Sequence, residues 1–194
     1  MMICLNSVNF VFVFLISVII SYIIYIKTKK NYTFIFVCLV TLYITFFICI
    51  TIFPITILSK SELDMLHSRV GEYITYHQLI PFKTILGVGS FNFFRQVVCN
   101  VLLFVPIPII IKTIANKMSG VKVILAGMSC SFFLEIIQLL IDVITRYPCH
   151  VCDIDDFILN SIGVIIGYLL YVLISRISVT DKLFKRLVYK EKMQ

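Results

Sequence analysis

The sequence contains unusually little charge, because Asp, Glu, Lys and Arg together make up only 14% of its 194 residues. A water-soluble domain covers most of its surface with polar groups, and about a quarter of its residues are charged. The low charge therefore excludes an ordinary soluble protein, and the high apolar content excludes a disordered one. The chain also lacks an internal repeat and a low-complexity linker that would indicate a second domain.

Apolar residues make up 60% of the chain, and its mean hydropathy is +1.04. Five apolar segments approach the ~20 residues that cross about 30 Å of hydrocarbon as a helix. They cover residues 8–26, 34–53, 95–111, 121–141 and 157–174. The first segment has no preceding basic stretch and no A-x-A cleavage pattern, so we interpret it as a retained helix rather than a signal peptide. We therefore expect an all-α integral membrane protein with five transmembrane helices, since no strand-like alternation suggests a barrel.

The distribution of positive charge predicts how these helices are oriented. Of the 17 basic residues, three lie between the first two segments, three between the third and fourth, and six after the fifth. The positive-inside rule assigns these three regions to the cytoplasm, so the N-terminus is outside and the C-terminus inside. The net charge of +7 fits this arrangement better than it fits nucleic acid, and we expect no nucleic-acid partner.

The longest loop, residues 59–92, is external in this topology. Ser61 and Asp64 have the spacing of a capping box, and Leu63, Leu66 and Val70 then recur at helical spacing. The pattern predicts a short amphipathic helix on the outer membrane surface.

Several polar side chains lie within or beside the apolar segments, where lipid makes them costly. One helix face in and after segment 121–141 contains Gly127, Ser131, Glu135, Gln138 and Asp142. A second face, at and before segment 157–174, contains Asp153, Asp156, Asn160, Gly163 and Gly167. We predict an outward-facing polar cleft, with Arg146 as the nearest counter-charge, that is formed by Asn100, Glu135, Gln138, Asp153, Asp156 and Asn160.

Most of these residues also have a structural interpretation. Asp153 and Asp155 can cap the helix that they precede or begin. The Gly163-x-x-x-Gly167 pair is typical of close helix packing, and Gln138 and Asn160 can form hydrogen bonds between helices. Glu135 has no helix end to cap, so we consider it the strongest functional candidate.

Cys149 and Cys152 form a C-x-x-C motif around His150 and Val151 in an external loop. Such a pair can be a redox centre or half of a metal site. Without a second ligand pair we interpret it as a plain loop, with a disulfide as one variant of that interpretation. We therefore predict no metal and no cofactor, with Cys149 and Cys152 as the candidates if a metal binds.

The order of these motifs resembles the VanZ-like family, which is named for a teicoplanin-resistance protein of Gram-positive bacteria. The resemblance covers residues 34–174 and rests on Leu79–Phe82, Asn100–Pro106, Glu135–Gln138, Arg146, Asp153–Asp156, Asn160, Gly163 and Gly167. Two features depart from the pattern: Pro108 stands where Gly is common, and the insert from Cys149 to Cys152 lengthens the loop after Arg146.

The resemblance implies a VanZ-like membrane domain at 34–174 in a bacterial cell membrane. An additional helix with a basic cytoplasmic loop precedes it at 1–33, and a basic cytoplasmic tail follows at 175–194. The implied function is reduced susceptibility to teicoplanin or other lipoglycopeptides at the outer leaflet. The implied partners are membrane lipids, a lipid-linked cell-wall precursor or the antibiotic.

An alternative is an enzyme that acts on a lipid headgroup or a lipid-linked precursor. In it Glu135 is a general acid or base, and Asp153 and Asp156 hold a divalent cation. A small transporter is a third interpretation, which the lack of an inverted repeat disfavours.

Overall fold

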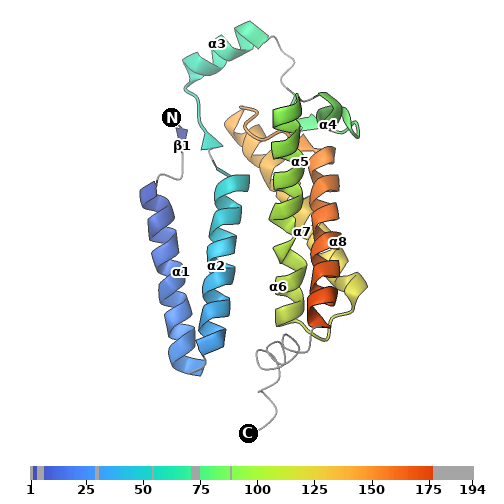
Figure 1. The fold of residues 1–194 in the computed structure, drawn as a ribbon. Coiled ribbons are helices and arrows are strands. Elements are labelled where there is room, and N and C mark those ends of the chain that lie inside the picture. Colours follow the sequence, from blue (N-terminus) through green and yellow to red (C-terminus); the bar gives the residue numbers. More distant parts are fainter. Residues whose placement is uncertain are drawn as a thin grey trace. The chain divides into compact units, whose positions relative to one another are not determined.

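The computed structural model describes residues 2–3, 7–28, 31–53, 55–70, 75–87 and 89–176, which are almost entirely helical (Figure 1). The helices are α1 (Ser7–Thr28), α2 (Asn31–Thr51), α3 (Lys60–Val70), α4 (Lys83–Gly87), α5 (Ser90–Phe104), α6 (Pro106–Ile114), α7 (Gly120–Thr145) and α8 (Ile154–Ser175). Four two-residue strands accompany them: β1 (Met2–Ile3), β2 (Ile55–Thr56), β3 (His77–Gln78) and β4 (Cys152–Asp153). Most of the basic tail at 175–194 lies outside the described residues.

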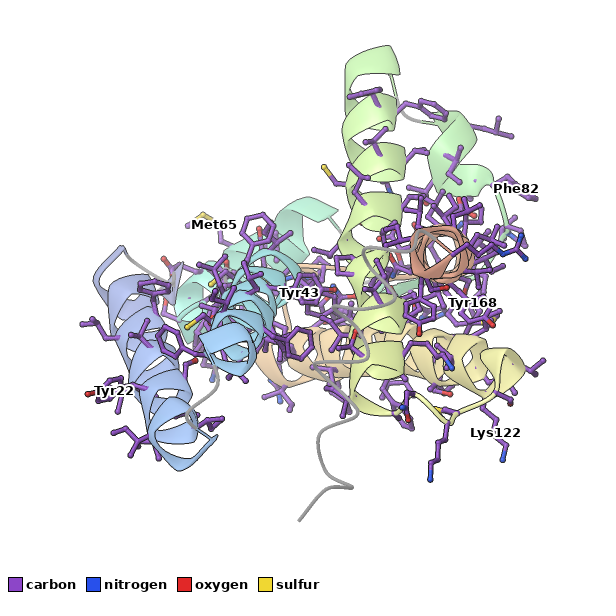
Figure 2. All side chains as sticks on the ribbon, turned by 60° about the horizontal axis from the view of Figure 1, so that its bottom comes forward. Tyr22, Tyr43, Met65, Phe82, Lys122 and Tyr168 are labelled. Atoms are coloured by element: carbon purple, nitrogen blue, oxygen red, sulfur yellow. The ribbon has the colours of Figure 1, made fainter. Side chains whose placement is uncertain are left out.

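Four stretches are long and apolar enough to cross a membrane, which confirms the predicted class of all-helical membrane protein. They are Phe34–Thr51, Gln96–Ile114, Gly120–Thr145 and Ile154–Ser175. The first predicted segment also forms a helix, α1, which has 22 residues and includes the apolar stretch Phe14–Ile24. Tyr22 points outward from α1 (Figure 2), with 55% of its surface exposed. That α1 is a fifth membrane span, and that the helices have the orientation expected from the charges, stay predictions.

The chain divides into two compact units, and each is described here by itself. The first unit contains residues 1–76 and 138–151, and the second contains residues 77–137 and 152–194. In the first unit α1 packs along α2 (Figure 1), and β1 pairs antiparallel with β2. Helix α7 contributes residues to both units.

Helix α3 is the predicted amphipathic helix, but the predicted capping box of Ser61 and Asp64 is wrong. Ser59 N donates to Glu62 Oε2 at 2.7 Å, and Glu62 N donates to Ser59 Oγ at 3.4 Å. The helix begins at Lys60, so the reciprocal pair is Ser59 and Glu62 rather than Ser61 and Asp64. The hydroxyl and the backbone amide of Ser59 both lower the pKa of Glu62, because they donate to its charged form.

The second unit is built around α8, which packs along α5 and α6. The predicted helix 95–111 is interrupted, because Pro106 has no N–H and starts the separate helix α6. Val105 between the two helices keeps α-helical angles, so the chain continues in nearly the same course. Helix α7 also contacts α8 closely, where Tyr168 lies against Gly120 (Figure 2).

Two glycines allow α8 to approach α5 and α6. A Cβ atom added at Gly163 would collide with the carbonyl oxygen of Val101, and one at Gly167 would collide with that of Val105. Both glycines are buried. The close approach brings the start of α8 beside the polar end of α5, where the candidate site lies.

Candidate functional site

Four carboxylates of the second unit gather around the start of α8, and we call them the acidic cluster: Glu135, Asp153, Asp155 and Asp156. Exposed fractions are 4% for Glu135, 5% for Asp153 and 0% for Asp155. Asp153 ends β4, which pairs in parallel with β3, so a short sheet holds the entry to α8 in place. Glu135 reaches the same place from α7, and its carboxyl is near enough to Asp153 and Asp156 for like-charge repulsion.

Asp153 is the N-cap of α8, which is the structural role that the sequence left open beside a catalytic one. Its Oδ1 accepts a hydrogen bond from Asp155 N at 2.9 Å, and its Oδ2 accepts one from Thr84 Oγ1. Its own backbone N–H donates to Glu135 Oε2 at 3.0 Å. The two carboxylate oxygens of Asp153 therefore stabilise the first turn of α8 and connect it to α4.

Asp155 caps the start of α4 rather than the helix that contains it, which corrects the sequence interpretation. Its carboxylate accepts hydrogen bonds from the backbone N–H of Phe82, Thr84 and Ile85, at 2.5, 3.0 and 3.1 Å. Phe82 has a φ of 64°, which is uncommon for a bulky residue. The buried carboxylate thus stabilises an otherwise unfavourable turn after Pro81.

Asp156 interacts with two amide side chains of α5. Asn100 Nδ2 donates to Asp156 Oδ1 at 2.5 Å, and Gln96 Nε2 donates to the same oxygen at 3.3 Å. The sequence predicted that Asn100 and Asp156 would meet, but it missed Gln96. Gln96 stands one helical turn before Asn100, and that spacing was the available signal.

Glu135 is the least satisfied member of the acidic cluster. Within the described residues, its one hydrogen bond comes from Asp153 N. Among the Lys, Arg and His side chains that the structure describes, which exclude that of Arg95, none forms an ion pair with the cluster, and Arg146, predicted as its counter-charge, is exposed. Buried like charges are stable only if a proton, a cation or a hydrogen-bond donor compensates them. The cluster is therefore a place where a donor-bearing ligand would be stabilised.

Two more polar side chains lie one turn further into the helices. Ser131 precedes Glu135 by four residues on α7, and Asn160 follows Asp156 by four on α8. Ser131 Oγ and Asn160 Oδ1 are buried, and within the described residues neither has a hydrogen-bond partner. Such atoms are rare in folded proteins, and a water or ligand is the usual explanation.

Hydrogen bonds already use part of the acceptor capacity of the two carboxylates that the enzyme alternative assigns to a cation. Asp153 is committed to Thr84 and Asp155, and Asp156 to Asn100 and Gln96. Among the described residues, the one set of three metal-ligating side chains with ligand atoms within 4.8 Å of each other lies outside the acidic cluster. What the structure shows at this site is a set of hydrogen-bond acceptors.

Three other predicted residues belong to the first unit. Gln138 donates from Nε2 to the carbonyl oxygen of Thr51 at 2.9 Å, so it joins α7 to the end of α2. Arg146 has a φ of 55° in the loop after α7 and forms no ion pair with any described residue. Cys149 lies in the same loop and forms no disulfide with Cys152, so the variant of that loop with a disulfide is wrong.

Comparison with known proteins gives one match. A family model described as VanZ/LLP1 matches residues 34–175. The matched region contains all of α2 through α8 except for the first three residues of α2, and it includes the whole acidic cluster. No curated protein and no solved structure matches the chain significantly.

Proposed function

The chain belongs to the VanZ/LLP1 family, and from this premise we propose that it lowers susceptibility to teicoplanin and related lipoglycopeptides. It would do so in a bacterial cell membrane, at the outer leaflet. The acidic cluster would bind the headgroup of a membrane lipid or of a lipid-linked cell-wall precursor. A precursor held there is less accessible to the antibiotic.

The buried acceptor atoms of the acidic cluster support this proposal best. Glu135 and Asn160 Oδ1 present such atoms, and no basic side chain that the structure describes forms an ion pair with the cluster. The complementary headgroup carries hydrogen-bond donors, as an ammonium group or a sugar with free hydroxyls does. A phosphate alone would be repelled by the same charge, so we infer that the donor-bearing part of the headgroup enters the site.

The proposal requires the start of α8 to face outward. With the N-terminus outside and the C-terminus inside, α3 is external and the loop before α7 is cytoplasmic. In a chain without native cysteines, an impermeant maleimide should label Asp64→Cys on intact cells, and should label Lys117→Cys only after lysis. Both positions are exposed, so accessibility reports the side of the membrane. The reverse labelling pattern would place the acidic cluster inside and end the proposal.

Antibiotic binding tests the function directly. A Gram-positive host that expresses the wild-type chain should bind less fluorescent teicoplanin than the empty host. Glu135→Gln and Asp156→Asn, at matched membrane levels, should restore most of that binding, because each replaces a carboxyl group of the site by an amide of the same shape. Fluorescent vancomycin, which has no lipid tail, should bind equally to all strains.

The control variant is Asp64→Asn, which removes a charge from the exposed surface of α3 and should behave as wild type. If wild type and the empty host bind teicoplanin equally, the resistance function does not apply to this chain. If the control restores binding as well as Glu135→Gln does, charge in general is responsible and the acidic cluster is not.

The enzyme alternative rests on Glu135, which keeps acceptor capacity beside Asp156 and is suited to acid–base catalysis. The same strains distinguish it from binding. Mass spectrometry of extracted lipids should find identical headgroups in all strains if the protein only binds. A modified headgroup that is present with wild type and absent with Glu135→Gln would instead establish the enzyme.

A further inference from the structure

A second group of side chains, in the first unit, has the composition of a metal site. Asp142, Cys149 and His150 each present a ligand atom, and these atoms lie within 4.8 Å of one another. We propose that this group, which we call the loop triad, binds a divalent transition-metal ion, with Zn²⁺ the best match. The proposal is independent of the acidic cluster and of the antibiotic function.

The loop after α7 holds the triad in position through its backbone. The Asp142 carboxylate accepts hydrogen bonds from the N–H groups of Cys149 at 3.0 Å, His150 at 3.2 Å and Val151 at 2.9 Å. Asp142 is fully buried, and Val151 has a φ of 50° that closes the turn. Hydrogen bonds of this kind orient a ligating carboxylate before the metal arrives.

The imidazole of His150 is positioned to bind a metal ion, and its Nδ1 has no hydrogen-bond partner among the described residues. Its Nδ1 lies 3.7 Å from Asp142 Oδ1, which is too long for a hydrogen bond. Two ligands with bonds of about 2 Å to a tetrahedral Zn²⁺ lie about 3.3 Å apart, so little movement is needed. Nδ1 is also buried without a hydrogen-bond partner in the described part of the chain, and an ion would satisfy it.

Cys149 determines which metals fit. Its free sulfur accepts a hydrogen bond from Thr56 N at 3.3 Å. Thiolate and imidazole ligands suit Zn²⁺, whereas Ca²⁺ and Mg²⁺ prefer oxygen ligands. Three protein ligands leave a fourth position for water or an external ligand, as in open zinc sites.

The competing interpretation is that Asp142 only shapes the loop. The two interpretations need different parts of the same residues. Loop shaping uses the backbone N–H groups of Cys149 and His150, whereas metal binding uses their side chains. Side-chain substitutions at these positions therefore separate the two roles without removing the hydrogen bonds to Asp142.

The test is metal binding by the purified full-length chain in detergent micelles. We expect equimolar zinc by elemental analysis after dialysis, and Co²⁺ should give an intense thiolate-to-metal charge-transfer band. Cys149→Ser should abolish that band and weaken binding by at least ~10-fold, and His150→Gln should weaken binding similarly. Cys152→Ser is the matched control, since Cys152 is outside the loop triad, and it should bind as wild type does.

Circular dichroism and size-exclusion chromatography establish that each variant is folded, and His150→Gln carries the test if Cys149→Ser is not. The proposal is overturned if the wild-type chain binds no more Zn²⁺ or Co²⁺ than Cys149→Ser does. It is also overturned if Cys152→Ser removes the band while His150→Gln keeps it, because the metal would then belong to the C-x-x-C motif.

Discussion

Replacing Asp155 by asparagine should lower the free energy of unfolding by about 3 kcal/mol or more. The native carboxylate accepts three backbone N–H groups with its two oxygens, and it is fully buried. An asparagine offers one acceptor oxygen, and its NH₂ group would face amides that also donate. At least one buried donor therefore loses its partner. The measurement is unfolding of the purified chain by SDS in mixed micelles.

Asp156→Asn provides an informative comparison, because the partners of Asp156 are the side-chain amides of Gln96 and Asn100. These amides can rotate to present oxygen instead of nitrogen, whereas the backbone amides bound by Asp155 cannot. We expect the loss at Asp156 to be clearly smaller than the loss at Asp155. Equal losses would show that charge, rather than the fixed backbone donors, determines the stability of this region.

Gly163→Ala should strongly disrupt helix packing in the second unit. The new Cβ would collide with the backbone oxygen of Val101, which belongs to α5 and cannot turn aside as a side chain can. Overpacking usually lowers the free energy of unfolding by about 1–3 kcal/mol. Because this methyl group would push two helices apart, we expect a loss at or above the upper end of that range. The melting temperature of the purified chain and its level in membranes should both fall.

Gly89→Ala is the matched control for this substitution. An added Cβ at Gly89 would have no atom within 4 Å, and its φ of −61° suits alanine. Because Gly89 is the N-cap of α5, where alanine is less favourable than glycine, we expect a loss of at most about 1 kcal/mol, clearly smaller than that of Gly163→Ala. If Gly163→Ala is equally harmless, α8 does not approach α5 as closely as we describe.

The membrane class and most helix positions could be predicted because lipid imposes a simple requirement on the chain. Long apolar runs have few alternatives to helices, and the observed spans overlap the predicted ones. The ends were less predictable because capping decides them locally. Asp153 caps α8, which begins at Ile154, three residues before the predicted segment, and Ser59 caps α3 two residues before the predicted cap.

Helix periodicity also predicted part of the candidate site. It placed Asp156 and Asn160 on one face and brought Asn100 toward Asp156, as the structure has them. It could not reveal the role of Thr84, because that residue lies in the short helix α4, 69 residues before Asp153 in the sequence. Contacts between segments distant in sequence follow from tertiary packing rather than from local pattern.

The cysteine motif illustrates a second limit of sequence reasoning. The spacing C-x-x-C directed attention to Cys152 as the partner of Cys149. In the folded loop, the sulfur of Cys149 instead lies near Asp142 and His150. A two-cysteine motif does not reveal the backbone turn at Val151. It also does not reveal that the carboxylate of Asp142 accepts a hydrogen bond from Cys149 N, seven residues later.

The attachment of α4 to Asp155 has a consequence for biosynthesis. Phe82 and Asp155 are separated by 73 positions in the sequence, and α4 has five residues, too few for a stable isolated helix. During synthesis the segment around Phe82 leaves the ribosome long before its acceptor exists. Asn100 is likewise synthesised before Asp156, the acceptor of its hydrogen bond. The second unit can therefore be completed only when its last helix arrives, and a chain that stops before α8 leaves these donors unpaired.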